Sequence, residues 1–155
     1  FDKTTVIFTA PNADSNNKVI IKLINKYVKK NKKSFFFKSL GVQKYFSLLK
    51  FASVVIGNSS SGILEVPYFK KPTVNIGNRQ KGRMKASSII DCGYDEKNIK
   101  NAISLAISEK FSKICSKSND TYGKYGASLK SYNIIKKRIN NIIIKKEFFD
   151  LNSKL

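Results

Sequence analysis

The sequence predicts an α/β domain built on a Rossmann-like, doubly wound parallel sheet. Short apolar strands alternate along the chain with amphipathic helices, and the connections between them are short. That order is typical of βαβ units, in which successive strands lie parallel. A length of 155 residues gives room for one domain with a tail, and 41% hydrophobic residues suffice for a buried core.

The first third of the chain supplies two strand and helix pairs. Residues 5–9 form a short β-branched run that ends in a proline turn, with Asp14 as the expected helix cap. Apolar residues then recur at helical spacing over 19–28. The second strand is predicted over 34–37 and the second helix over 42–52.

The third strand is predicted in the middle of the chain. Residues 53–56 are apolar on both faces, as in a sheet covered by helices on both sides. A loop of glycine, asparagine and serine follows, and then a short helix from about Ile63. The next two strands are predicted over 73–76 and 87–91, and an amphipathic helix over 97–111.

The end of the chain is predicted to be a long helix, because apolar residues line one side of it. That side needs a partner surface, either the sheet or a second domain. We expect a nucleotide-binding domain over 1–127, the packed helix over 128–149 and a tail over 150–155. The chain starts at Phe1 and its single methionine is Met84, which indicates a piece of a longer protein.

The composition excludes several kinds of chemistry. Without histidine, the chain cannot assemble a Ser–His triad, a histidine-ligated metal or a histidine acid–base step by itself. Cys92 and Cys115 show no CxxC pattern, which predicts two free thiols in a reducing compartment and no zinc site. No apolar run is long enough to span a membrane, and we expect no membrane partner and a cytoplasmic location.

The formal net charge of +20 comes almost entirely from lysine, because arginine occurs only at Arg79, Arg83 and Arg138. Proteins that read bases and phosphates usually depend on arginine forks. The lysines are spread along the whole chain, so we interpret them as a solvated surface that attracts anionic small molecules. We expect no nucleic-acid partner, although a basic nucleic-acid-binding domain stays open as an alternative.

Candidate site residues follow the predicted strands, since ligands of open α/β sheets bind at the carboxyl ends of the strands. After the third strand come Ser59, Ser60, Ser61 and Gly62. Small residues and hydroxyls before a helix start are typical of phosphate sites. Glu65 follows, and an acid beside a phosphate site commonly binds both ribose hydroxyls. The alternative is a flexible loop with a capping serine and a surface glutamate.

The loops after the first and fourth strands also contain candidates. Asn12 lies in the first, where a simple capping turn is the alternative. The fourth-strand loop contains Arg79 and Arg83, and arginine suits bidentate phosphate contact. The alternative there is an exposed basic turn. Tyr45 is a core residue by its helical spacing, but an aromatic near a nucleotide site can stack on a base.

Three motifs coincide with these loops: TAPNAD over 9–14, VIGNSSSGILEVP over 55–67 and PTVNIGNRQKGR over 72–83. A weaker fourth extends over 119–128. Together they resemble the hydrolysing UDP-N-acetylglucosamine 2-epimerases of sialic-acid and nonulosonic-acid synthesis. The resemblance implies the C-terminal half of a glycosyltransferase-B-like two-domain fold, with UDP against this half and the sugar in the interdomain cleft. The fourth motif departs from the family pattern at Lys124 and Tyr125.

Position by position, the resemblance implies roles for the candidate residues. Ser59, Ser60 and Arg79 match residues that bind the UDP phosphates, and Glu65 matches the acid that binds the ribose.

The remaining matches concern the base and the rest of the nucleotide site. The position of Tyr45 matches an aromatic that stacks on uracil, and Leu40 matches a residue whose backbone reads the base. Asn12, Ser61 and Gly62 complete the expected nucleotide site.

The implied reaction expels UDP by elimination across C1–C2, and water then adds to give N-acetylmannosamine. The resemblance puts the proton-transfer residues in an N-terminal half, so we expect no catalytic residue here, no cofactor and no metal. The partners are then UDP or UDP-N-acetylglucosamine, the N-terminal domain and, in an oligomer, further copies. The isolated piece should bind UDP weakly and turn nothing over. Alternatives are an epimerase of UDP-diacetylbacillosamine and the donor-binding domain of a UDP-sugar glycosyltransferase.

Overall fold

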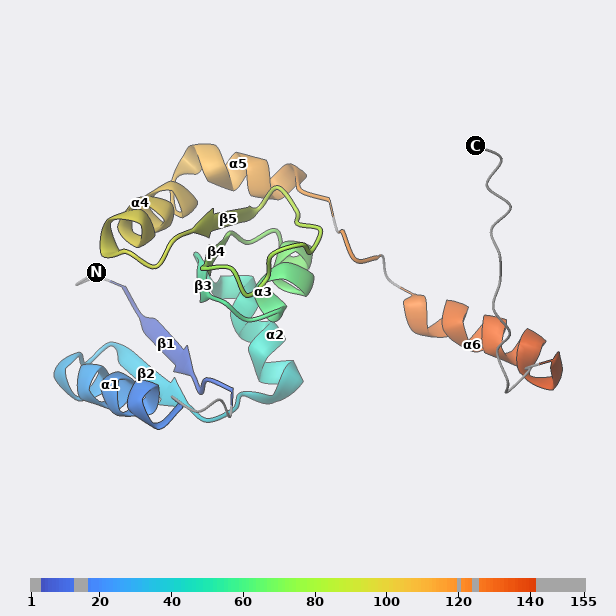
Figure 1. The fold of residues 1–155 in the computed structure, drawn as a ribbon, viewed down its shortest axis with the longest axis horizontal. Coiled ribbons are helices and arrows are strands. Elements are labelled where there is room, and N and C mark those ends of the chain that lie inside the picture. Colours follow the sequence, from blue (N-terminus) through green and yellow to red (C-terminus); the bar gives the residue numbers. More distant parts are fainter. Residues whose placement is uncertain (1–3, 13–16, 120, 124–125, 142–155) are drawn as a thin grey trace. The chain divides into compact units, whose positions relative to one another are not determined.

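Parallel strands joined by helices make up most of the structure, a computed structural model that describes residues 4–12, 17–119, 121–123 and 126–141. The chain divides into two compact units, Phe1–Asn119 and Asp120–Leu155. All described strands lie in the first unit, and helix α6 lies in the second (Figure 1).

The elements follow the predicted alternation. They are β1 (Val6–Thr9), α1 (Asn17–Lys30), β2 (Ser34–Phe37), α2 (Gly41–Phe51), β3 (Val55–Gly57), α3 (Ser61–Leu64), the 3-10 helix η1 (Val66–Phe69), β4 (Thr73–Ile76), β5 (Ile89–Cys92), α4 (Glu96–Ala106), α5 (Glu109–Lys117), α6 (Ala127–Arg138) and the 3-10 helix η2 (Ile139–Asn141). The strands expected over 34–37 and 73–76 have the predicted bounds. The strand expected over 87–91 begins two residues later, and the expected cap Asp14 lies outside the described residues.

Strand pairing is parallel, which confirms the predicted mixed α/β class. β1 pairs with β2 along its whole length, with Val6 opposite Ser34. β3, β4 and β5 form a second ladder in that order, in which Val74 lies between Ile56 and Ile90. Within the described residues, the strands therefore form one ladder of two and one of three, and the continuous sheet that we expected is divided between them.

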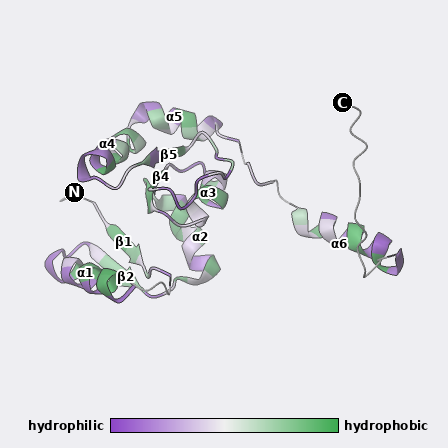
Figure 2. Ribbon diagram, viewed as in Figure 1, coloured by the Kyte–Doolittle hydropathy of each residue, from purple (hydrophilic) through white to green (hydrophobic). Residues whose placement is uncertain are grey.

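The core of the larger unit lies around the central strand β4. Val74 is completely buried and packs with Ala102 and Ala106 of α4, while Ile76 and Ile90 surround this cluster. The small alanine side chains let α4 approach β4 and β5, with which it is in contact. Figure 2 shows apolar residues along β1 and β2 and both polar and apolar residues along α1. Helix α1 packs against β2.

One predicted helix is wrong in its extent. The helix expected over 97–111 is divided into α4 and α5, and the break lies at Ile107 and Ser108. The Ser108 hydroxyl accepts the backbone N–H of Phe111 at 3.2 Å and so caps the N-terminus of α5. A serine followed by an acidic residue in the first turn favours a new helix start, which outweighs the continuing apolar spacing.

The second unit begins with α6, which supports part of the long terminal helix that the sequence predicts. The described helix covers Ala127–Arg138 and ends in η2, whereas residues 142–149 of the expected helix lie outside the described residues. Leu129, Tyr132 and Ile135 are all more than half exposed. Across the described part of the chain, no helix has both the length and the apolar character needed to cross a membrane.

Candidate functional site

The predicted serines, Gly62 and Arg79 lie in two loops that follow the carboxyl ends of strands in the three-stranded ladder. Because β3, β4 and β5 run parallel, Gly57 pairs with Asn75 and Ile76 pairs with Cys92 at their carboxyl ends. The serine loop, residues 58–62, follows β3. The arginine loop, residues 77–83, follows β4. Both loops therefore start from neighbouring strands at the edge where ligands of open sheets bind.

The serine loop leads into a short helix, as predicted, which begins earlier than expected. The helix predicted from about Ile63 begins at Ser61 and is a single turn, followed by η1. Bonds within this turn already use the N–H groups of Gly62 and Ile63, which donate to the carbonyls of Ser59 and Ser60 at 3.2 and 3.0 Å. The dipole of so short a helix is small. The donors left for an anion are therefore chiefly the hydroxyls and N–H groups of Ser59 and Ser60.

Gly62 is needed where α3 crosses β4. Its carbonyl accepts the Thr73 hydroxyl at 2.9 Å. A Cβ atom at position 62 would lie 2.8 Å from the Thr73 methyl carbon, closer than real Cβ atoms approach. Glycine therefore lets the serine loop lie directly against the central strand.

A chain of hydrogen bonds joins three of the predicted residues. The hydroxyls of Tyr45 and Ser61 are 2.5 Å apart, and the Ser61 hydroxyl donates to Oε2 of Glu65, also at 2.5 Å. Tyr45 comes from α2, Ser61 opens α3 and Glu65 follows α3. Burial raises the pKa of the Tyr45 phenol above its usual 10.0; the Ser61 hydrogen bond opposes the rise and the Glu65 charge adds to it.

Arg79 of the arginine loop meets the loop after β1. With the Asn12 amide oxygen turned toward it, Arg79 donates from both terminal nitrogens to that oxygen, at 2.9 and 3.3 Å. Asn12 in turn accepts the side-chain amide of Asn17 at its backbone carbonyl. Both Asn12 and Arg79 are exposed, so the guanidinium is oriented and still accessible to a ligand.

Sequence reasoning singled out the arginine loop but missed the residue that anchors it. Gln80 is 3% exposed, and its Nε2 donates to the backbone carbonyl of Asn58 at 2.8 Å. This bond joins the arginine loop to the serine loop next to Ser59. Within the described residues its Oε1 is buried without a hydrogen-bond partner. Gln80 lies inside the NRQKGR motif between the two arginines, but no spacing in the sequence indicates its contact with Asn58.

Tyr94 is a second residue that the sequence did not point out. Its hydroxyl donates to Oδ1 of Asn78 at 3.2 Å and accepts the Asn78 N–H at 3.4 Å. Gly77 has a φ of +79°, and a Cβ there would collide with the Tyr94 ring. The ring and the glycine together fix the start of the arginine loop. The available signal was that Tyr94 is the second residue after the end of β5, at the same end of the ladder as the other candidates.

Leu40 and Ser60 stand apart from these contacts. Leu40 is the half-buried residue at the N-terminus of α2, and the Gly41 N–H that follows it donates to the Ser39 hydroxyl at 3.2 Å. Ser60 precedes α3, and no side-chain bond of Ser60 is formed within the described residues. Both lie beside elements that carry the other candidates, and within the described residues neither side chain forms a hydrogen bond with Tyr45 or Arg79.

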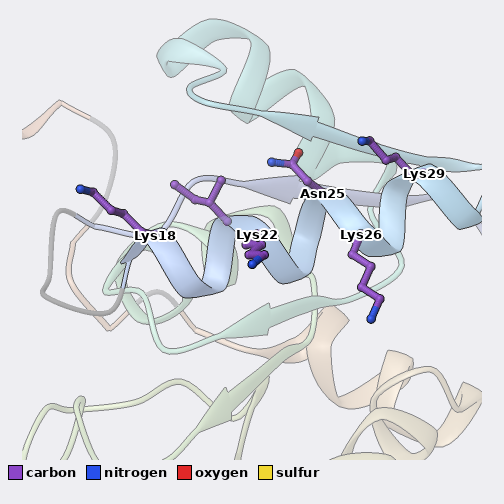
Figure 3. Close-up of a pocket in the computed structure, with 6 residues that line it drawn as sticks. Lys18, Lys22, Asn25, Lys26 and Lys29 are labelled. Carbon is purple, nitrogen blue, oxygen red and sulfur yellow. The ribbon is translucent and has the colours of Figure 1, made fainter.

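A shallow hollow lies elsewhere, on one face of α1. Figure 3 shows lysine side chains projecting from successive turns of that helix. The residues lining the hollow are Lys18, Ile21, Lys22, Asn25, Lys26 and Lys29. All four lysines are exposed and come from a single helix, so the hollow is a solvated cationic face rather than part of the strand-end site. Among the described residues, no cluster of three or more metal-ligating side chains occurs.

The functional groups at the strand ends suit a phosphorylated, polyhydroxylated ligand. Arg79 and the hydroxyls of Ser59 and Ser60 are donors for an anion. The Glu65 carboxylate is an acceptor for hydroxyls, and Tyr45 is a half-buried aromatic next to it. These are the groups that a nucleotide site needs for phosphate, ribose and base, respectively.

Comparison with known sequences identifies a family. The sequence profile of the family described as UDP-N-acetylglucosamine 2-epimerase matches residues 1–136. A GDP/UDP-N,N'-diacetylbacillosamine 2-epimerase (hydrolyzing) of Campylobacter jejuni is 52% identical over 88 residues, which is 56% of this chain and 23% of that protein. A UDP-N-acetylglucosamine 2-epimerase of Neisseria meningitidis is 34% identical over 153 residues, which is 95% of this chain and 38% of that protein.

A solved structure shares the fold. It is described as an S. aureus MnaA-UDP co-structure, and it matches with a TM-score of 0.57 at 18% identity over 96% of this chain and 48% of that one. At that identity the likeness concerns the fold alone. The chain spans 23% and 38% of the lengths of the two relatives, and less than half of the solved structure.

Proposed function

The chain belongs to the UDP-N-acetylglucosamine 2-epimerase family, and on that premise we propose that it is the UDP-binding half of a hydrolysing 2-epimerase. The observation that carries the proposal is the joining of the serine and arginine loops by Gln80 and Asn58 at the strand ends. That bond joins the loop that contains the three serines to the loop that contains Arg79, and Glu65 follows the serine loop along the chain. A nucleoside diphosphate has a phosphate, a diol and a base that match these groups.

In the proposed complex, the phosphates lie between Arg79 and the hydroxyls of Ser59 and Ser60. The guanidinium is held by Asn12 through one acceptor and keeps further N–H groups for phosphate oxygens. Glu65 accepts from the ribose hydroxyls, and the ring of Tyr45 stacks on uracil. The backbone of Leu40, at the start of the same helix, is then available to the base edge.

In the proposed reaction, the C1–O bond to UDP breaks and the sugar loses the C2 proton, which gives a glycal. Water then adds across the double bond to give N-acetylmannosamine. Negative charge grows on the diphosphate as the C1–O bond breaks. Arg79 and the serine donors are arranged before the reaction starts, so they stabilise that charge without reorganisation. The proton transfers belong to an N-terminal half of the same enzyme, and the isolated chain is expected to be inactive.

The identity of the sugar has two candidates. The Neisseria relative is named for UDP-N-acetylglucosamine, and the Campylobacter relative for a diacetylbacillosamine nucleotide. The Campylobacter relative has the higher identity, although over a shorter stretch of the chain. UDP-N,N'-diacetylbacillosamine is therefore a candidate substrate beside UDP-N-acetylglucosamine. In the proposed geometry the sugar lies in the cleft toward the other half, so the groups described here contact the UDP part that both substrates share.

The experiment is an assay of the full-length protein with each UDP-sugar and no acceptor. We expect UDP release together with a free 2-epimerised sugar, N-acetylmannosamine in the case of UDP-N-acetylglucosamine. A glycosyltransferase with the same donor-binding fold would release UDP efficiently only after an acceptor is added. That acceptor dependence would contradict the proposal.

A further inference from the structure

The hydrogen bonds between Tyr45, Ser61 and Glu65 have a defined direction. An ionised carboxylate only accepts, so the single hydroxyl proton of Ser61 is used on Glu65 at 2.5 Å. The oxygen of Ser61 is then an acceptor, and the Tyr45 phenol must be the donor across its own 2.5 Å contact. The chain therefore runs from Tyr45 through Ser61 to Glu65.

This direction determines how the carboxylate of Glu65 is presented. Its Oε2 is fixed by Ser61, and among the described residues no group donates to Oε1. Rotation of the carboxylate about its terminal bond would break the Ser61 contact. The carboxylate is thus held through one oxygen before any ligand arrives, and Oε1 and one lone pair of Oε2 have no donor among the described residues.

We propose that Ser61 and the hydroxyl of Tyr45 are positioning residues that orient Glu65 toward the two ribose hydroxyls of a nucleoside diphosphate. The proposal rests on the proposed function, because it assigns the ribose to Glu65. It gives Tyr45 two separable parts: the ring faces the base, and the phenol oxygen orients the acid that holds the sugar.

Packing around Tyr45 supports this role. Its ring is 5.9 Å from that of Phe46, and Phe46 is in turn 5.4 Å from Phe69 of η1. The contact between Phe46 and Phe69 thereby holds α2 against the segment after α3, next to the hydrogen-bonded residues. A phenol is protonated, and so a donor, at neutral pH, and burial raises the pKa of Tyr45 further from that range.

The test compares UDP with 2',3'-dideoxy-UDP, which keeps the base and phosphates but lacks the diol. For the 155-residue chain we expect Tyr45→Phe and Ser61→Ala each to weaken UDP binding by about two- to tenfold, the size of one hydrogen bond. Binding of the dideoxy compound should change by less than about twofold. Ser61→Thr, which keeps a hydroxyl, should recover most of the lost UDP affinity.

Two further variants test whether the two hydroxyls act together and whether the effect is specific to them. The double variant Tyr45→Phe/Ser61→Ala should lose no more UDP affinity than Ser61→Ala alone, because both act through the same carboxylate. Tyr68→Phe removes the hydroxyl of an exposed tyrosine near the site and is the matched control, with no expected effect on either ligand.

The outcomes separate this proposal from the one on which it rests. If the wild-type chain binds UDP and the variants weaken UDP and the dideoxy compound equally, the hydroxyls serve only the local structure and the positioning role is wrong. If Tyr45→Phe and Ser61→Ala leave UDP binding unchanged, the role is also wrong, while the UDP-binding function stands. If the wild-type chain binds neither ligand, the proposed function fails and this inference falls with it.

Discussion

The side-chain amide of Gln80 donates to the backbone carbonyl of Asn58 over 2.8 Å, and this bond ties the two loops of the site together. It is made by a buried side chain, so water does not compete for it. Asn58 immediately precedes Ser59, and Gln80 immediately follows Arg79. The relative position of the serine loop and the arginine loop therefore depends on Gln80.

Gln80→Ala should weaken both folding and UDP binding. The substitution leaves the Asn58 carbonyl without its donor and is expected to lower the free energy of unfolding by about 1–3 kcal/mol. UDP affinity, measured where the variant is still folded, should fall as well, because Arg79 is no longer held beside the serines. Denaturant unfolding and a UDP titration measure the two effects. Gln43→Ala on the exposed side of α2 is the control, with a change within about 0.5 kcal/mol. Lower stability with unchanged UDP affinity would show that the bond serves the fold only.

Gly77→Ala should destabilise the protein more than Gly82→Ala. Both glycines have a φ near +80°, so alanine has the same backbone cost of about 1–2 kcal/mol at either position. Only at position 77 does the new Cβ collide with the Tyr94 ring, while position 82 has nothing within 4 Å. Thermal or denaturant unfolding of the two variants measures the difference, and adding Tyr94→Ala should remove it. Equal losses would mean that the ring moves aside without cost.

Gly62→Ala is expected to disturb the serine loop by a clash with β4. The added Cβ would lie 2.8 Å from the methyl carbon of Thr73, and such overpacking costs about 1–3 kcal/mol. Thr73→Ser removes that methyl and keeps the hydroxyl bond to the Gly62 carbonyl. Adding Gly62→Ala to the Thr73→Ser variant should therefore lower the free energy of unfolding much less than Gly62→Ala does in the wild type. Unfolding experiments on the three variants suffice, and a double variant no better than Gly62→Ala would contradict this account.

The stability contributed by Asp91 should disappear in acid. Partial burial raises the pKa of Asp91, but hydrogen bonds from Lys85 and Asn75 and the Lys85 charge outweigh it and lower the pKa below 3.8. A carboxyl with a lowered folded pKa stabilises the protein above its unfolded value and loses that contribution as the pH falls through the folded value. At neutral pH the free energy of unfolding of the wild type should exceed that of Asp91→Asn by up to about 1 kcal/mol, since the Lys85–Asp91 pair is partly exposed. Unfolding measured between about pH 7 and pH 3 should show the gap closing. A gap independent of pH would refute the assignment.

Much of the fold could be predicted from local sequence patterns. The strands at Ser34–Phe37 and Thr73–Ile76 are short apolar runs bounded by polar or proline residues, and their bounds are as predicted. The break at Ser108 was missed because Ile103 and Ile107 continue the apolar period, while the competing signal is a single capping hydroxyl. A periodic pattern indicates which side of a helix is buried, but the capping hydroxyl determines where the helix stops.

The sequence indicated candidate residues for the site but not the contacts between them. The serine, glutamate and arginine positions follow from loops at strand ends, whereas the bond between Tyr45 and Ser61 depends on how α2 approaches α3. Periodicity alone assigned Tyr45 to the core. Gln80 was also missed as an anchor, because its role comes from burial against Asn58, which no spacing in the sequence indicates.

Calorimetric titration of the 155-residue chain with UDP, and in parallel with ADP, tests the central claim most directly. ADP has the same ribose and diphosphate, so a difference between the two reports a site that reads uracil. We predict weak, saturable binding of one UDP, weaker binding of ADP, and a loss of about 1–3 kcal/mol of UDP affinity in Glu65→Ala. Equal binding of both nucleotides that falls steeply with salt would instead indicate a nonspecific basic surface and would contradict the account.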